Sequence, residues 1–312
     1  MQFKKPKFWD LKNQSVSSVL LWPFSKLVEF SNLIKKRDKK KFSNIKTICV
    51  GNIYIGGTGK TSLAINISKI LKDKNIKFCF IKKFYQKQID EIKLLENYGK
   101  VFSSNNRINC LTDAIKDGYE FAIFDDGLQD YSINYDISFL CFNNINWIGN
   151  GLTIPAGPLR ESIGNLKKYK NIFLNGNLEN IENIKNYIFK TNPKSQIFDG
   201  MYIPVNLNKF NLSEKYLVFS GIGNHQTFIS MLKKNNFKIV KDIEFPDHYN
   251  YKINEIDKIF SISKDLNCNI ITTEKDFLRL SIKNKDKIKF VKSELYIKEK
   301  EKLINALFSI NE

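Results

Sequence analysis

The hydrophobic pattern of the chain alternates between two periods from about residue 47 to residue 174. Short apolar runs typical of buried strands are separated by segments in which apolar residues recur at helical spacing. The predicted strands are 48–50, 78–81, 119–124, 137–142 and 171–174, and the predicted helices are 62–71, 111–116 and 179–189. Such alternation predicts an α/β fold, with a mainly parallel sheet and helices on both of its faces.

The segment 198–210 interrupts this pattern. It contains Gly200, Pro204 and two asparagines and has no helical periodicity, so it is interpreted as a linker. A second, smaller α/β unit is predicted after it, with strands 216–220, 237–243, 270–273 and 288–291 and helices 226–234, 253–266 and 299–310. We therefore expect a first domain at 1–197, a linker at 198–212 and a smaller domain at 213–312, whose final helix is free to pack back on the first domain.

The N-terminal segment 16–34 is strongly apolar but is interrupted by Pro23, Lys26 and Glu29. It falls short of the roughly 18 uninterrupted apolar residues that a transmembrane helix needs. A basic cluster follows at 35–41. Two interpretations remain open: a helix lying on an anionic membrane surface, or a helix packed on the domain and followed by a solvated loop.

Composition narrows the possible partners. The 312-residue chain has a formal charge of +18, with 50 basic and 32 acidic residues. The arginines are few, namely Arg37, Arg107, Arg160 and Arg279. Because nucleic-acid readers use the planar guanidinium group for phosphate and base contacts, this lysine bias makes the charge weak evidence for nucleic acid, and an anionic membrane or a phosphorylated substrate fits it equally well. The five cysteines form no C-x-x-C pair and are predicted to be buried free thiols of a reducing compartment.

A glycine-rich turn joins the predicted strand 48–50 to the predicted helix 62–71 and ends in Gly59, Lys60 and Thr61. Strand, glycine-rich loop and helix in this order are typical of a phosphate-binding loop. Its backbone N–H groups and helix N-terminus attract phosphate, and its lysine and hydroxyl reach the terminal phosphates and Mg²⁺. The predicted nucleotide contacts in the loop are Gly56, Gly57, Thr58, Gly59, Lys60, Thr61 and Ser62. We expect ATP as the ligand.

The loop departs from the strict phosphate-binding pattern in one place. That pattern has glycine five residues before Gly59, where this chain has Tyr54, and the nearest upstream glycine is Gly51. The entrance of the loop must therefore be built differently.

Two aspartates, Asp125 and Asp126, end the apolar run that begins near Tyr119. In a chain with a phosphate-binding loop, a carboxylate at the end of a buried strand is where Mg²⁺ is held against nucleotide phosphates. The sequence thus predicts a P-loop NTPase-like domain with a Mg²⁺ site.

The chain resembles the tetraacyldisaccharide 4′-kinases of lipid A assembly. The resemblance rests on the variant phosphate-binding loop and on ordered motifs that run nearly from end to end. These motifs are 125–129 (Asp-Asp-Gly-Leu-Gln), 149–161 (Gly-Asn-Gly, then Leu-Thr-Ile-Pro-Ala-Gly-Pro-Leu-Arg-Glu), 221–224 (Gly-Ile-Gly-Asn), 245–249 (Phe-Pro-Asp-His-Tyr) and 273–276 (Thr-Glu-Lys-Asp).

The resemblance implies transfer of the γ-phosphate of ATP to the 4′-hydroxyl of a lipid-anchored disaccharide 1-phosphate. It implies peripheral contact with an anionic membrane at the cytoplasmic face of the bacterial inner membrane, with no nucleic acid and no obligate protein partner. It also implies two α/β/α domains joined by a two-stranded linker, with the active site in the cleft between them. The strands of that linker would be 198–210 and 287–295.

The resemblance also implies roles for single residues. Asp90 would be the general base and His248 its partner, Lys60 would hold phosphate, and Asp125 would complete the catalytic set. Metal ligands would be Thr61, Asp126, Glu91 and Glu161, and further nucleotide contacts would be Gln129, Arg160, Thr273, Glu274, Lys275 and Asp276. The match is weakest at 82–84, where the family has Ser-Arg-Gly and this chain has Lys-Lys-Phe.

Two other classes of function are alternatives to a lipid kinase. One is a membrane-associated ATPase switch of the partitioning type, which has lysine directly before the paired glycines, where this chain has Ile55. The other is a basic nucleic-acid-binding module, which the scarcity of arginine disfavours. A switch would hydrolyse ATP without a lipid acceptor.

Overall fold

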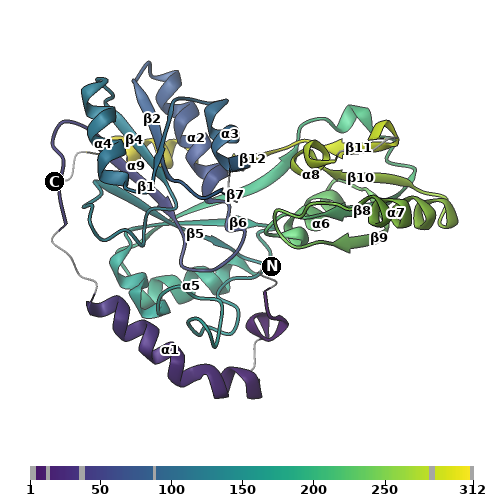
Figure 1. Cartoon of the computed structure of the whole chain (residues 1–312), viewed down its shortest axis with the longest axis horizontal. Coiled ribbons are helices and arrows are strands. Elements are labelled where there is room, and N and C mark those ends of the chain that lie inside the picture. Colours follow the sequence, from purple (N-terminus) through teal and green to yellow (C-terminus); the bar gives the residue numbers. More distant parts are fainter. Residues whose placement is uncertain (1–4, 12–14, 35–38, 87–88, 281–284, 310–312) are drawn as a thin grey trace. The chain divides into compact units, whose positions relative to one another are not determined.

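The computed structural model describes residues 5–11, 15–34, 39–86, 89–280 and 285–309 (Figure 1). The chain divides into two compact units, each considered by itself. The larger unit comprises Pro6–Gly200 and Ile297–Glu312, and the smaller unit consists mainly of Met201–Tyr296. Both boundaries fall inside strands, β7 (Gln196–Pro204) and β12 (Ser293–Ile297).

The larger unit is built on an eight-stranded sheet with the strand order β12-β7-β6-β5-β1-β4-β2-β3. Its other strands are β1 (Lys46–Gly51), β2 (Phe78–Lys83), β3 (Val101–Ser104), β4 (Phe121–Asp125), β5 (Ile137–Asn143) and β6 (Asn171–Gly176). Its helices are α1 (Val16–Ile34), α2 (Lys60–Asp73), α3 (Ile89–Glu96), α4 (Arg107–Lys116), α5 (Ile181–Thr191) and α9 (Lys300–Phe308). The pairs formed by β1 with β4 and β5, by β2 with β3 and β4, and by β5 with β6 are parallel.

Both faces of this sheet are covered. Ile48, Cys49 and Val50 follow one another along β1, and none of their side chains is exposed. Because successive side chains of a strand point to opposite faces, burial of all three requires packing on each side. Parallel strands end at the same edge of a sheet, so the loops after β1, β2 and β4 leave the sheet together.

The smaller unit has a four-stranded parallel sheet with the order β11-β10-β8-β9. Its strands are β8 (Lys215–Ser220), β9 (Lys238–Glu244), β10 (Asn269–Thr273) and β11 (Ile288–Val291), and its helices are α6 (His225–Lys234), α7 (Ile253–Asp265) and α8 (Glu274–Arg279). The central strand β8 is buried from Tyr216 to Ser220, whereas the edge strand β9 is largely exposed.

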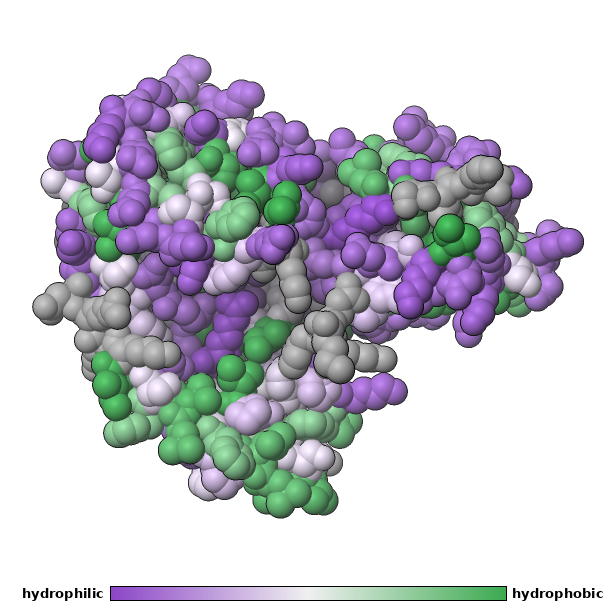
Figure 2. Space-filling model, in the orientation of Figure 1, coloured by the Kyte–Doolittle hydropathy of each residue, from purple (hydrophilic) through white to green (hydrophobic). Residues whose placement is uncertain are grey.

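Helix α1 packs with its polar side inward. The hydroxyls of Ser18 and Ser25 are buried, and Ser25 Oγ donates to the carbonyl of Thr153 at 2.7 Å. Its exposed side is apolar, formed by Val16, Val19, Leu20, Trp22, Phe24, Leu27, Phe30 and Ile34. Figure 2 shows apolar side chains gathered where Figure 1 places α1. The helix is thus packed on the domain and also presents an apolar surface.

The structure confirms the α/β class with its mainly parallel sheet, and it adds elements that the pattern did not predict. Strand β3 and helix α3 were not predicted. The segment interpreted as a linker begins with β7, whose neighbour at the edge of the sheet is β12; the two overlap the linker strands 198–210 and 287–295 that the resemblance implies. Residues 35–38 of the basic cluster lie outside the described residues. The proposed domain limits 1–197, 198–212 and 213–312 stay a prediction.

Candidate functional site

The glycine-rich loop lies between β1 and α2. Gly59 caps the N-terminus of α2 in the left-handed conformation, with φ +75°. A Cβ atom there would lie 2.6 Å from Asn175 Nδ2, so both conformation and space require glycine. Lys60 and Thr61 are the first residues of the helix. The N–H groups of that first helical turn have no partners within the helix and can bind an anion.

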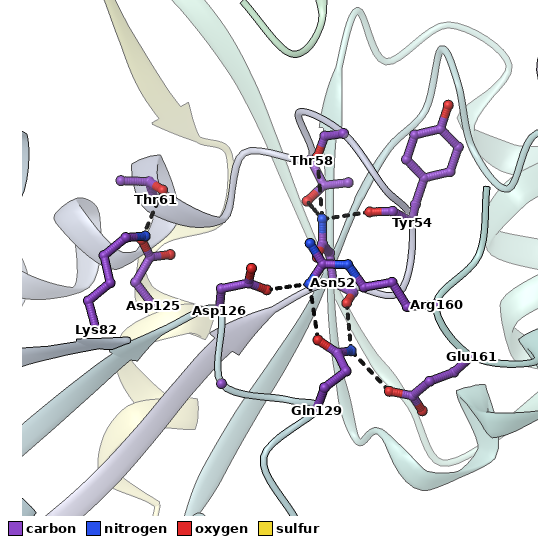
Figure 3. A network of polar contacts seen from close by, with 12 residues as sticks. Asn52, Tyr54, Thr58, Thr61, Lys82, Asp125, Asp126, Gln129, Arg160 and Glu161 are labelled. Carbon is purple, nitrogen blue, oxygen red and sulfur yellow. Dashed lines mark hydrogen bonds and ion pairs between the residues drawn. The ribbon is translucent and has the colours of Figure 1, made fainter. Parts of the chain in front are cut away.

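Asn52 shapes the entrance of this loop (Figure 3). Its side-chain nitrogen donates to the carbonyl of Tyr54 at 2.7 Å, to the carbonyl of Gly56 at 3.3 Å and to Thr58 Oγ1 at 2.8 Å. The Tyr54 ring is buried, and its hydroxyl donates to Asp10 Oδ1 at 2.6 Å. The tyrosine therefore fills the core, and the asparagine holds the turn that a glycine begins in the strict pattern.

Asp125 lies at the end of β4 and faces the first turn of α2. Its Oδ2 atom accepts hydrogen bonds from Thr61 Oγ1 at 3.1 Å and from Lys82 Nζ at 2.6 Å (Figure 3). The Lys82 ammonium also lies 2.7 Å from Glu91 Oε2. The other oxygen of Asp125, Oδ1, is buried and has no hydrogen-bond partner among the described residues.

Asp126 belongs to a second network in the same loops. Arg160 Nη1 donates to Asp126 Oδ1 at 2.8 Å and to Gln129 Oε1 at 3.1 Å. Gln129 Nε2 donates in turn to the carbonyl of Asn52 at 2.9 Å and to Glu161 Oε1 at 3.0 Å. The predicted residues Asp126, Gln129, Arg160 and Glu161 are therefore joined to the phosphate-binding loop through Asn52.

The charges of the site lie close together. Burial alone would raise the pKa of the Asp126 carboxyl, but the charges of Lys60 and Arg160 lower that pKa below its ordinary value. Burial alone would lower the pKa of the Lys82 ammonium, but Asp125 and Glu91 hold that pKa above its ordinary value. No described residue forms a hydrogen bond or ion pair with the side-chain ammonium of Lys60, so this charge is available to a ligand.

The predicted nucleotide contacts 273–276 lie in the smaller unit, at the junction of β10 and α8. Thr273 caps α8: its Oγ1 accepts from the backbone N–H of Asp276 at 3.1 Å and donates to Asp276 Oδ2 at 2.7 Å. Asp276 is fully buried, and its Oδ1 lies 3.4 Å from Arg279 Nη1. In this unit Thr273 and Asp276 thus build the start of the helix, and Glu274 and Lys275 are partly exposed beside them.

The two members of the predicted acid–base pair lie in different units. Asp90 is in the first turn of α3, next to Glu91, and its Oδ1 accepts from the Glu91 N–H at 3.0 Å. His248 lies in the smaller unit with φ +56°. Its Nδ1 accepts a hydrogen bond from Arg279 Nη2 at 3.0 Å. Their joint action stays a prediction.

Comparison with known proteins decides the family. The family model of the tetraacyldisaccharide-1-P 4′-kinases (LpxK) matches residues 17–311. A tetraacyldisaccharide 4′-kinase of Pelagibacter ubique (strain HTCC1062) is 56% identical over 312 residues, which cover 100% of this chain and 99% of that protein. The chain belongs to the tetraacyldisaccharide 4′-kinase family.

More distant members of the tetraacyldisaccharide 4′-kinase family agree in extent and in fold. The enzyme of that name from Rickettsia typhi (strain ATCC VR-144 / Wilmington) is 31% identical over 323 residues, covering 97% of each chain. A crystal structure of "apo" form LpxK from Aquifex aeolicus in complex with ATP is 21% identical, with a TM-score of 0.67, and covers 93% of this chain and 98% of its own. This last likeness shows the shared fold.

Family membership supports the kinase interpretation over the partitioning-type switch and the nucleic-acid module. None of the helices that the structure describes is long and apolar enough to cross a bilayer.

The sequence alone did not identify Lys82 and Arg279 as residues that contact the predicted site residues. Lys82 appeared only as a departure from the family motif, yet it contacts two predicted site carboxylates. Arg279 follows the 273–276 motif and contacts His248. The available signals were a lysine near the end of an otherwise apolar strand, and an arginine in a chain that has only four.

Proposed function

We propose that this member of the kinase family transfers the γ-phosphate of ATP to the 4′-hydroxyl of tetraacyldisaccharide 1-phosphate, a step of lipid A biosynthesis. The observation that carries the proposal is the placement of Lys60. It begins α2 directly after the left-handed Gly59, its ammonium forms no ion pair with any described residue, and its charge acts on Asp126. Such a lysine can neutralise the charge that develops on phosphoryl oxygens in the transition state.

The residues of the larger unit fit Mg²⁺. Asp125 accepts a hydrogen bond from the Thr61 hydroxyl with one carboxylate oxygen, and its other oxygen, Oδ1, is buried without a hydrogen-bond partner in the part of the chain that the structure describes. Thr61 and Asp126, with Glu91 and Glu161 as further ligands directly or through water, would hold the ion as the resemblance implies, and we add Asp125 to this set. Mg²⁺ commonly takes only one or two carboxylates and completes its shell with water and phosphate oxygens. When bound, the ion would neutralise negative charge on the phosphates.

The chain's own groups would do the remaining work. The amides of Gly57, Thr58 and Gly59 and the first turn of α2 would bind the phosphates. Arg160, held by Asp126 and Gln129, would orient that carboxylate and reach phosphate with its free N–H groups. Positioning and electrostatics dominate phosphoryl transfer, which agrees with a site composed of fixed charges.

Asp90 would accept the proton of the sugar hydroxyl, and His248 would tune it. Because the Arg279 guanidinium donates to Nδ1 of His248, this nitrogen carries no proton and Nε2 is the protonated one in the neutral ring. An imidazole N–H of fixed orientation is suited to hold a carboxylate. Full turnover of an Asp90→Ala enzyme would show that another residue is the general base. The segment 273–276 would border the nucleotide, in keeping with the resemblance.

We also propose peripheral binding to an anionic membrane at the cytoplasmic face of the inner membrane. The outward apolar side of α1 and the formal charge of +18 support this placement. The lipid-anchored substrate would then be met in the bilayer itself.

The test is transfer of labelled γ-phosphate from ATP to purified tetraacyldisaccharide 1-phosphate. Lys60→Ala should lower turnover by at least about 10²-fold. Lys72→Ala, which changes an exposed lysine later in the same helix, is the matched control and should be neutral. EDTA should stop transfer. Near-normal turnover of the Lys60→Ala enzyme, or ATP hydrolysis that ignores the lipid acceptor, would refute the proposal.

A further inference from the structure

Lys82 is a buried cation inside the larger unit. It lies at the carboxyl end of β2, and only 2% of its surface is exposed. A buried ammonium group is costly unless it is paired, and its partners here are two carboxylates, Asp125 Oδ2 at 2.6 Å and Glu91 Oε2 at 2.7 Å. The pairing is built into the sheet, because Lys82 and Asp125 stand opposite each other in the register of β2 and β4.

These contacts connect three elements that carry proposed catalytic groups. Asp125 accepts a hydrogen bond from Thr61, so the Lys82 contact extends to the first turn of α2. Glu91 is the neighbour of Asp90 in the first turn of α3. One ammonium group therefore touches the carboxylate beside the phosphate-binding loop and the helix that carries the proposed base.

We propose that Lys82 is a positioning residue for phosphoryl transfer, fixing Asp125 against Thr61 and the start of α3 against β4. This inference rests on the proposed function. Without the ammonium, two carboxylates that share one nitrogen as a close neighbour repel each other, so one of them moves. That movement displaces Asp125 or Asp90, and a displacement of about 1 Å can lower a rate by about 10²-fold.

The experiment compares variants that remove the ammonium with one that keeps a cation. Lys82→Met keeps an unbranched side chain that is one atom shorter and uncharged, and Lys82→Ser places there the residue of the family motif. Lys82→Arg keeps the charge. Lys83→Met is the control, because the next lysine along the strand is half-buried and lies 5.5 Å from the centre of the Tyr85 ring.

Turnover is measured per folded enzyme, with the folded fraction taken from circular dichroism, together with KM for ATP. We expect kcat to fall about 10²-fold in Lys82→Met and Lys82→Ser while KM for ATP changes less than about threefold. Lys82→Arg should recover at least about tenfold of that loss, and Lys83→Met should match the unchanged enzyme. A residue that serves stability alone would lower the unfolding midpoint and leave kcat per folded enzyme unchanged.

Unchanged kcat in a folded variant that lacks the ammonium overturns the inference. Equal falls in kcat for Lys82→Arg and Lys82→Met also overturn it, because the charge would then be irrelevant. Lys60→Ala, measured in parallel, separates this failure from that of the proposed function. If the Lys60→Ala enzyme is inactive while Lys82→Met is fully active, only the positioning role is wrong.

Discussion

Arg107 fixes the turn that follows β4. It begins α4 and is nearly buried, and its Nη2 donates to the carbonyl of Asp126 at 2.6 Å while its Nη1 lies 3.2 Å from Asp130 Oδ2. Asp130 also accepts from the Ser132 hydroxyl. These contacts hold Asp126 at φ +63°, a conformation that is unfavourable for a residue with a side chain. The backbone that presents the site carboxylates is thus held from outside the site.

Asp130→Asn should destabilise the protein by about 1–3 kcal/mol at pH 7, because it leaves the Arg107 guanidinium buried without its carboxylate. Burial alone would raise the pKa of Asp130, but the Ser132 hydrogen bonds and the Arg107 charge lower that pKa below its ordinary value. A lowered pKa contributes stability above the unfolded-state value of about 3.9 and loses it as pH falls through the folded-state value. Urea unfolding from pH 7 to pH 3 measures the difference, which should shrink only at the acid end.

The matched control for this variant is Asp113→Asn. Asp113 pairs with Lys116 at 3.6 Å, and both side chains are largely exposed, so its removal should change the free energy of unfolding by less than about 0.5 kcal/mol. A difference for Asp130→Asn that is equally large at pH 3 would contradict the assignment to its carboxylate.

Single residues mark the limit of what the sequence predicts. Gly59, Lys60 and Asp125 carry recognisable signals, since loop, lysine and strand-end carboxylate belong to one pattern. Lys82 carries only a weak signal, because a lysine near the end of an apolar strand is usually solvated. Its burial follows from partners that lie 9 and 43 positions away in the sequence. That these two partners meet the Lys82 ammonium can be recognised only from the folded structure.

At the scale of elements, α1 has its hydrophobicity on the outside. The contacts of its inner side are hydrogen bonds to the segment 150–160: Asn150 Nδ2 to Ser18 Oγ at 3.1 Å, Ser25 Oγ to the Thr153 carbonyl at 2.7 Å, Thr153 Oγ1 to Glu29 Oε1 at 3.1 Å and Asn32 Nδ2 to the Arg160 carbonyl at 3.2 Å. The serines pack closely against the segment 150–160 through hydrogen bonds. The large apolar side chains of α1 therefore stay exposed on its outer side. An exposed apolar surface of this kind marks an interaction site.

Replacing Leu20, Phe24 and Leu27 by Gln should abolish co-sedimentation with anionic vesicles while leaving the fold intact. The three side chains are 70%, 58% and 66% exposed, so they contribute little to the core. Each full burial in lipid is worth about 1.5–3 kcal/mol, so each loss should weaken binding by roughly tenfold or more.

The control for the vesicle experiment is Ser25→Ala. This change removes buried hydrogen bonds to Thr153 and Ala156 and should lower the unfolding midpoint without lowering the affinity for vesicles. Unchanged sedimentation of the triple Gln variant would show that the outward side of α1 does not bind the membrane.

The elements that the sequence missed share a weak hydrophobic signal. In β3 every residue is half-buried, so the strand lacks an apolar run. In α3 only Leu95 is buried, which leaves no apolar stripe to detect. Strand β7 contains Gly200 and ends at Pro204, so the residue pattern alone indicated only a linker there, and the family resemblance was needed to expect a strand. The sequence correctly predicted the buried strands β1, β4, β5, β6 and β8. A strand that is buried on both faces has a continuous apolar run, which is easily recognised.

At the scale of the whole molecule, the cysteines are distributed unevenly between the units. All five are free thiols; Cys49, Cys79, Cys110 and Cys141 are buried in the larger unit, and Cys268 is half-buried in the smaller one. Burial raises the pKa of Cys79 to about 12 and holds the pKa values of Cys49 and Cys141 well above the ordinary range. A buried thiol that stays protonated reacts slowly.

Native protein exposed to excess iodoacetamide should therefore be modified first at Cys268. In increasing urea, the other four thiols should react together as the larger unit unfolds, since all are packed in or beside its sheet. Peptide mass spectrometry identifies the sites, and Cys268→Ser should lack the early modification. Fast labelling of Cys49 or Cys141 without urea would contradict this order.

The hydrogen bonds between α1 and the segment 150–160 fix the orientation of the helix and also its distance from the phosphate-binding loop. The segment ends at Arg160, which contacts Asp126 beside the phosphate-binding loop. If α1 rests in the head-group layer as proposed, the loop stands at a fixed height above the bilayer. The kinase would then select its substrate by height above the bilayer, because a sugar hydroxyl is within reach only when its lipid anchor holds it at the height of the loop. The same hydroxyl on a saccharide raised by a longer spacer is out of reach, even if its chemistry is identical.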